Sequence, residues 1–191
     1  MRARRGLLFV ISGPSGVGKD ALIEKLVAQD PGIRRSVSYT TRAPRPGEKD
    51  GVDYSFVSRE QFERLIDEGE FLEYANYDGN LYGTSAHRVA ELEAEGFVVI
   101  LKIDVKGAEQ VRQRLPDAVF VFLAPPSMQE LMRRITNRDT ESAEDRSARQ
   151  MIAEVEMKYA SHYDHVVVND DLDRAVQEVL GIVKAEREQT V

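Results

Sequence analysis

A glycine-rich turn between a short apolar run and a helical pattern is the feature that most constrains this chain. The apolar run spans residues 6–11, and Gly13-Pro-Ser-Gly-Val-Gly18-Lys19-Asp20 follows it. This segment fits the G-x-x-x-x-G-K pattern of a phosphate-binding loop, in the strand–loop–helix context that the pattern requires. Backbone N–H groups turn inward, the helix N-terminus adds positive potential, and the lysine reaches the outer phosphates. The predicted phosphate ligands are Gly13, Pro14, Ser15, Gly16, Val17, Gly18, Lys19 and Asp20.

Further apolar runs alternate with helical patterns along the chain. Strand-like runs occupy residues 97–101, 119–123 and 165–168. Helical spacing is found over residues 21–29, 105–114, 128–138, 143–159 and 172–185. Apolar strands separated by helices are typical of a parallel sheet covered on both faces. We therefore expect an α/β fold of three layers, with helices on both sides of a parallel sheet.

The composition limits the possible sites and partners. The 191 residues include no cysteine, which excludes a disulfide scaffold, a thiolate zinc site, an iron–sulfur cluster and thiol catalysis. The net charge of -7 argues against a protein that coats nucleic acid. The basic residues are 19 Arg and 7 Lys. The planar guanidinium of arginine can bind a phosphate through two N–H groups at once, so this excess of arginine suits a phosphate ligand. The apolar run is too short for a signal peptide or a membrane span, so we expect a cytoplasmic protein that does not enter a membrane.

The middle of the chain has a different character. Residues 36–83 are polar, rich in turns and aromatic, with short strands expected at 54–57, 70–74 and 80–82 and a hairpin turn at Asp78-Gly79. This pattern predicts a small lobe of strands inserted into the α/β core. Residues 127–150 are helical, rich in both charges, and a second candidate insertion.

Four segments resemble the guanylate kinase family. They are Ser36-Val-Ser-Tyr-Thr-Thr-Arg42-Ala-Pro-Arg45-Pro-Gly-Glu48, Gly51-Val-Asp-Tyr54-Ser-Phe, Glu70-Phe-Leu-Glu73 and Tyr82-Gly-Thr84-Ser. The resemblance covers about residues 6–187 and implies transfer of the γ-phosphoryl group of ATP to GMP, giving ADP and GDP, with Mg²⁺. It also implies a P-loop core (6–35, 95–126 and 155–187), a GMP-binding lobe of mixed strands (36–94) and a helical lid (127–154).

The resemblance implies which residues hold GMP. Its phosphate ligands would be Arg42 and Arg45, whose forks make charge-assisted bidentate contacts, with Ser38, Tyr54 and Tyr82 as hydroxyl partners. Glu73 and Thr84 match the positions that read guanine. A carboxylate accepts from N1–H and the 2-amino group of guanine, whereas adenine has an acceptor at N1 and nothing at C2. The Thr84 hydroxyl can donate to O6. Asp104 is a further implied GMP contact.

The resemblance also implies a catalytic set and a contact to the ATP base. Arg138 and Arg149 match the lid arginines, which would close over the phosphates and act with Lys19 and Arg42. The family usually has Gly after the first lid arginine, where this chain has Asp139. Asn169 matches a position near the ATP base.

Two positions depart from the family pattern: one has gained an acidic residue, and the other has a basic residue in place of an acidic one. Asp20 stands where the phosphate loop usually has Ser or Thr, whose hydroxyl holds Mg²⁺. Lys102 stands where the family's Leu-Asp-Ile-Asp strand has its first acid, because this chain reads Leu101-Lys102-Ile103-Asp104. We predict that Asp20 pairs with Lys102, and that Mg²⁺ is bound by Asp20, directly or through water, and by Asp104.

Two other functions stay open at this point. A ribose 1,5-bisphosphate phosphokinase also has Asp after the loop lysine, which Asp20 fits, but residues 36–54 with Glu73 and Thr84 do not fit it. A guanylate-kinase-like module binds phosphopeptides without catalysis, but such modules tend to lose the phosphate loop. We expect ATP and GMP as small-molecule partners, no nucleic acid, and a monomer or homodimer.

Overall fold

The structure is a computed structural model that describes residues 6–77, 79–135 and 143–189. Its elements are β1 (Leu7–Ser12), α1 (Lys19–Gln29), β2 (Ile33–Arg35), β3 (Tyr39–Thr40), β4 (Ser55–Phe56), α2 (Arg59–Asp67), β5 (Phe71–Tyr77), β6 (Asn80–Ser85), α3 (Ala86–Ala94), β7 (Val98–Lys102), α4 (Val105–Arg114), β8 (Val119–Ala124), α5 (Met128–Ile135), α6 (Ala143–Lys158), a 3₁₀ helix (Tyr159–His162), β9 (His165–Val168) and α7 (Leu172–Gln189). None of the helices in these ranges is both long and apolar enough to cross a membrane.

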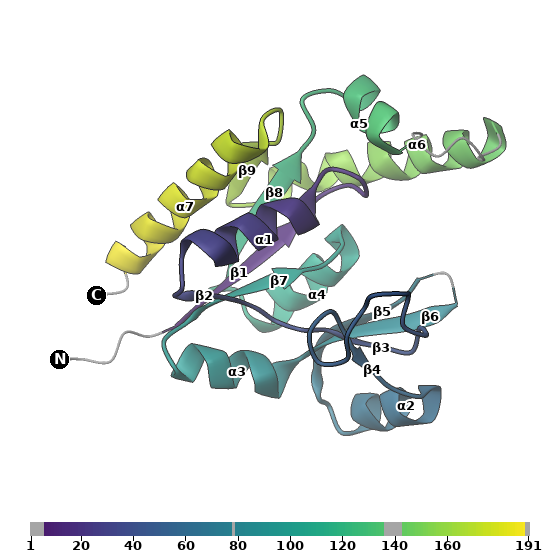
Figure 1. The fold of residues 1–191 in the computed structure, drawn as a ribbon, viewed down its shortest axis with the longest axis vertical. Coiled ribbons are helices and arrows are strands. Elements are labelled where there is room, and N and C mark those ends of the chain that lie inside the picture. The colour runs from purple at the N-terminus through teal and green to yellow at the C-terminus, as the bar shows by residue number, and fades with distance from the viewer. Residues whose placement is uncertain (1–5, 78, 136–142, 190–191) are drawn as a thin grey trace.

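A parallel sheet forms the centre of the molecule (Figure 1). In the described part of the chain it has five strands in the order β2-β7-β1-β8-β9, and every neighbouring pair is parallel. The expected α/β fold is therefore confirmed. Strand β2 was not predicted, because it has only three residues and no alternation to reveal it.

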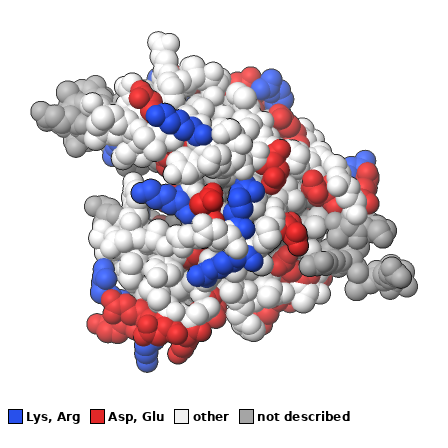
Figure 2. Space-filling view, turned by 180° about the vertical axis from the view of Figure 1, so that it is seen from behind, with Lys and Arg blue, Asp and Glu red and all other residues white. Residues whose placement is uncertain are grey.

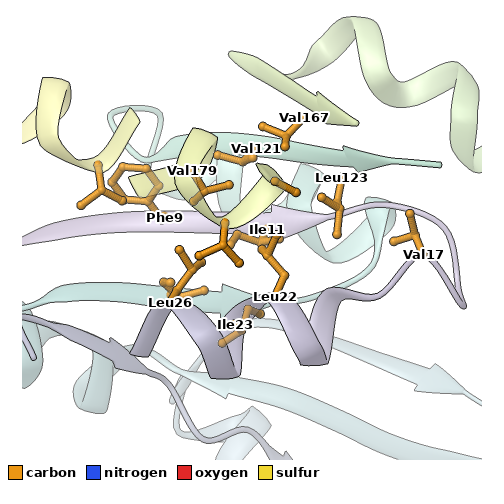
Figure 3. Packing of buried hydrophobic residues seen from close by; sticks show 14 of the residues in the cluster. Phe9, Ile11, Val17, Leu22, Ile23, Leu26, Val121, Leu123, Val167 and Val179 are labelled. Carbon is orange, nitrogen blue, oxygen red and sulfur yellow. The ribbon is translucent and has the colours of Figure 1, made fainter. Parts of the chain in front are cut away.

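Helices cover both faces of this sheet, which gives the expected three layers (Figure 1). On one face, Phe9 and Ile11 of β1 pack with Leu22 and Leu26 of α1 and Val179 of α7 (Figure 3). The alternate residues of β1 point to the other face, since successive side chains of a strand alternate. There they pack with residues of α3 and α4: the buried set includes Leu8, Val10, Val89, Ala108 and Val111.

A second sheet lies beside the first and is made from residues 39–85. Its order is β4-β3-β6-β5; β3 and β4 are parallel, and the other two pairs are antiparallel. Helix α2 closes its own small core, in which Phe62 stacks on Phe71 with ring centroids 4.5 Å apart. Figure 1 shows this sheet and α2 apart from the main sheet. The division into core, lobe and lid by residue number stays a prediction.

Helices α2 and α3 were not predicted, although α2 begins at a recognisable signal. Ser58 and Gln61 form a capping box, in which each side chain bonds the backbone of the other residue. The residues around this capping box are mostly polar, so the helix was not recognised from the sequence. Helix α3 follows the second sheet but packs on the main one through the buried Val89.

Phe62 should hold the small lobe together. Its side chain is fully buried, so Phe62→Ala should lower the free energy of unfolding by about 3–5 kcal/mol. Urea denaturation would measure this loss. Met151→Ala is the control, because Met151 is 59% exposed and should change stability by less than about 0.5 kcal/mol. Equal losses in the two variants would contradict the expectation.

Candidate active site

The loop between β1 and α1 is packed so tightly that only glycine fits at two of its positions. A Cβ on Gly13 (φ +137°) would lie 2.2 Å from the carbonyl oxygen of Leu123, and one on Gly18 (φ +102°) would lie 2.6 Å from Nδ2 of Asn169. Gly18 also precedes α1 without a side-chain cap. The first N–H groups of α1 are therefore available to an anion.

Lys19 lies over the same loop. Its ammonium donates to the carbonyl oxygens of Gly13 at 2.5 Å and Pro14 at 3.0 Å. Burial lowers the pKa of Lys19 to about 8, and the negative charge of Glu156 partly opposes this. An enclosed cation held by neutral carbonyls is suited to receive a phosphate.

Two cavities open beside this loop. One of about 310 Å³ is lined by Gly13, Ser15, Lys19, Arg35, Ser36, Ser38, Tyr54, Glu73, Ala75, Tyr77, Tyr82, Lys102, Ile103, Asp104 and Glu156. The other, of about 300 Å³, is lined by Asp20, Glu24, Arg35, Arg42, Arg45, Glu48, Asp53, Tyr54, Tyr82 and Lys102. The first cavity thus joins the phosphate loop to the second sheet, and four residues belong to both.

Glu73 and Thr84 face each other across β5 and β6. They are paired in register, both are buried, and the Thr84 hydroxyl donates to Oε1 of Glu73 at 2.6 Å. Burial raises the pKa of Glu73 to about 7, the Thr84 hydrogen bonds oppose the rise, and Asp104 adds to it. The single hydroxyl hydrogen of Thr84 is already used here, so donation to a base would require it to leave Glu73.

Arg42 is held by an acidic partner from its own loop. Its guanidinium donates to both carboxylate oxygens of Glu48, at 2.8 and 3.0 Å, and Glu48 also accepts from the backbone N–H of Arg45 at 2.7 Å. The bonds to Glu48 raise the pKa of Arg42, and the same bonds lower the pKa of Glu48. Both bonds to Glu48 come from Nη2, and Nη1 donates to the carbonyl oxygen of Ala43 at 2.7 Å, so the guanidinium is held in place from two sides.

The predicted pairing of Asp20 with Lys102 is confirmed. Nζ of Lys102 lies 2.5 Å from Oδ1 of Asp20. Asp104 instead caps α4, with Oδ1 accepting from the N–H of Gly107 at 2.7 Å. Within the described residues, no group of three or more His, Asp or Glu side chains could hold a metal ion.

The remaining predicted site residues lie farther from the cavities or outside the description. Asn169 is buried and donates to the carbonyl oxygen of Val17 at 2.8 Å, so it supports the phosphate loop from behind. Arg149 is exposed on α6 and does not line either cavity. Arg138 and Asp139 lie outside the described residues.

Several cavity residues were not predicted, among them Arg35, Ser36 and Glu156. Arg35 ends β2 and donates to the carbonyl oxygen of Asp53 at 3.4 Å. The buried Oγ of Ser36 and Oε2 of Glu156 have no hydrogen-bond partner among the described residues. Glu156 lies on α6 among several other charged residues, so its local sequence does not mark it as a cavity residue. On the face shown in Figure 2, basic and acidic side chains lie side by side around the middle of the molecule.

Comparison with known proteins agrees with this geometry. A family model described as Guanylate kinase matches residues 5–186. The guanylate kinase of Symbiobacterium thermophilum is 52% identical over 187 residues, which are 98% of this chain and 89% of that protein. The guanylate kinase of Rubrobacter xylanophilus is 51% identical over 181 residues, 95% of each chain. The crystal structure of guanylate kinase from Anaplasma phagocytophilum matches with a TM-score of 0.77 and 36% identity, over 96% of this chain and 87% of that one. The chain therefore belongs to the guanylate kinase family.

Proposed function

We propose that this protein transfers the γ-phosphoryl group of ATP to the phosphate of GMP, giving ADP and GDP. The observation that carries the proposal is the first cavity, because it is lined both by Lys19 of the phosphate loop and by Glu73 of the second sheet. Phosphoryl transfer needs a donor and an acceptor held in line, with their charge neutralised. A cavity with a phosphate cradle at one part and a buried carboxylate at another meets that need.

The acceptor phosphate is proposed to lie with Arg42 and Arg45 in the second cavity. Tyr54 and Tyr82 line both cavities, and their hydroxyl groups can donate hydrogen bonds to a phosphate. Ser38 lines the first cavity. A phosphate carries more charge than the Glu48 carboxylate and has more acceptor oxygens. It would therefore compete with Glu48 for the fork of Arg42.

The base of GMP is proposed to be read by Glu73. Its buried carboxyl can accept hydrogen bonds from N1–H and from the 2-amino group of guanine. These bonds would offset the free energy cost of removing the ionised carboxylate from water. Adenine would leave the carboxyl unpaired. A polar mismatch of this kind discriminates by about 10⁴-fold or more.

Mg²⁺ is proposed as the cofactor. The donor set fits it, because Mg²⁺ is usually held by one or two carboxylates together with substrate phosphates and water. Asp20 and Asp104 would supply carboxylate oxygens, and Asp20 would have to release Lys102 to do so. The bound ion would supply charge neutralisation for the phosphates.

The remaining parts of the proposal concern the catalytic arginines and the setting. We propose that Arg138 and Arg149 act with Lys19 and Arg42 once a lid closes, and that Asn169 lies near the ATP base. We further propose a cytoplasmic monomer or homodimer with ATP and GMP, and not nucleic acid, as partners. The net charge of -7 supports the last point.

Release of ADP tests the reaction. With ATP and Mg²⁺, we expect ADP in the presence of GMP and at least about 10⁴-fold lower kcat/KM with AMP. Ribose 1,5-bisphosphate should give no ADP, and a positive result with it alone would favour the ribosyl phosphokinase. Absence of ADP with every acceptor would favour the binding module.

Lys19 should be required for this activity. Lys19→Met removes one preorganised cation from the phosphates and should lower kcat by about 10²–10³-fold. Lys25→Met is the matched control, because Lys25 lies on the same helix, pairs with Asp173 and lines neither cavity. Its kcat should stay near that of the native protein. A similar loss in both variants would contradict the assigned role.

Glu73 should make the ligand-free protein less stable as pH rises. Its carboxyl has a pKa of 4.5 when unfolded and about 7 when folded, so the folded state binds more protons between these values. The free energy of unfolding should therefore fall across that window, by an amount on the order of 3 kcal/mol, and stay level above it. Lys19, with a pKa lowered from 10.5 to about 8, acts only at higher pH and with the opposite sign.

Glu73→Gln isolates this effect, because an amide does not titrate. Urea unfolding of the native protein and the variant should agree near pH 4.5, and the variant should be the more stable at pH 8. Taking the difference between the two proteins removes the contribution of Glu156, whose pKa burial also raises. Parallel stability curves from pH 4.5 to 8 would show that Glu73 does not titrate in this window.

A further inference from the structure

Lys102 stands where the two cavities meet. It lines both of them, together with Arg35, Tyr54 and Tyr82. It is the last residue of β7 and pairs in register with Ile11 of β1, two residues before the phosphate loop begins. Its ammonium therefore lies beside the phosphate loop and also beside the space that Arg42 and Arg45 line.

The ion pair with Asp20 is asymmetric. The side chain of Lys102 is 20% exposed, whereas that of Asp20 is 64% exposed. The lysine is thus the enclosed member, and the bond to Asp20 uses one of the three N–H donors of its ammonium. Pairs with an exposed partner are weak, so a phosphate, which is a stronger acceptor, can replace Asp20 or share the ammonium with it.

Charges of both signs line the first cavity, where Lys19, Arg35 and Lys102 stand among the carboxyl groups of Glu73, Asp104 and Glu156. Lys19 and Lys102 line the same cavity, and the charge of Lys102 is, after burial, one of the causes that lower the pKa of Lys19. Arg35 contributes a further cation to both cavities and donates a long hydrogen bond, at 3.4 Å, to the carbonyl oxygen of Asp53. An anion bound between Lys19, Arg35 and Lys102 would reduce the repulsion among these three cations.

We propose that Lys102 is a phosphate-binding residue of this protein, whose ammonium contacts the phosphate of GMP at the junction of the two cavities, with Asp20 holding it there beforehand. The proposal rests on the proposed function and adds to it a cation from β7, where the family pattern has an acid. It also explains why the acid at position 20 and the base at position 102 occur together, because Asp20 keeps the Lys102 ammonium in place while GMP is absent.

A simpler role must be separated from this one. Lys102 could serve only to neutralise Asp20, whose bare charge would repel phosphate. The two roles differ in the double variant Asp20→Asn/Lys102→Met, which removes both charges and keeps the size of both side chains. Neutralisation alone predicts that the double variant recovers native affinity for GMP, whereas a direct contact predicts that it does not.

Calorimetric titration of GMP and of guanosine into the full chain, with EDTA and without ATP, tests the proposal. Lys102→Met should weaken GMP binding by about tenfold or more, as expected for loss of a charged hydrogen bond. The double variant should stay at least about fivefold weaker than the native protein. Guanosine, which lacks the phosphate, should bind every variant within about twofold of native. Lys102→Arg should keep most of the affinity, and Lys25→Met should behave as native.

Three results would overturn the proposal: native GMP affinity in Lys102→Met, native affinity in the double variant, or equal losses for GMP and guanosine. The last result would mean that the substitution disturbs the fold, and thermal melting of each variant would show that directly. If the native protein itself bound no GMP, the proposed function would fail together with this inference. If native binding is normal and only the variants disagree, the inference alone fails.

Discussion

The hydrogen bonding of β1 in parallel to both β7 and β8 is the constraint on which the site depends. Parallel neighbours end at the same edge of a sheet, so the residues that follow β1 and β7 come together there. The loop after β1 is pressed against Leu123 of β8 closely enough to exclude any side chain at Gly13. Lys102 at the end of β7 reaches Asp20 at the start of α1 by the same arrangement. A shift in either register would separate these groups.

The site is costly to maintain without ligands. Glu73 is buried with a raised pKa, the pKa of the half-buried Lys19 is lowered, and Oε2 of Glu156 has no partner among the described residues. Two of these groups would gain partners from a nucleotide: a base with two donors for Glu73, and phosphates for Lys19. The proposed substrates therefore supply the interactions whose absence makes the free protein less stable.

Most of the main sheet could be predicted, and much of the second sheet could not. The runs at 97–101 and 119–123 are continuous and apolar because β7 and β8 are buried on both faces, and such runs are easily recognised. Strands β3 and β4 have two residues each, and β2 has three, which is too short for any periodicity to show. Helix α2 carries a polar surface and buries mainly Phe62, so its capping box was the one clear signal of its start.

The sequence by itself determined the phosphate loop, the α/β class, the family and the two positions at which charge is exchanged, because these depend on residue type and on local spacing. Tertiary structure decided which groups share a cavity. Arg35, Glu156 and Lys102 are 121 positions apart at their widest, and nothing in their local sequence relates them. They meet because three separate elements, β2, β7 and α6, end or pass at one edge of the sheet, and such meetings follow from the packing of whole elements and not from any one segment.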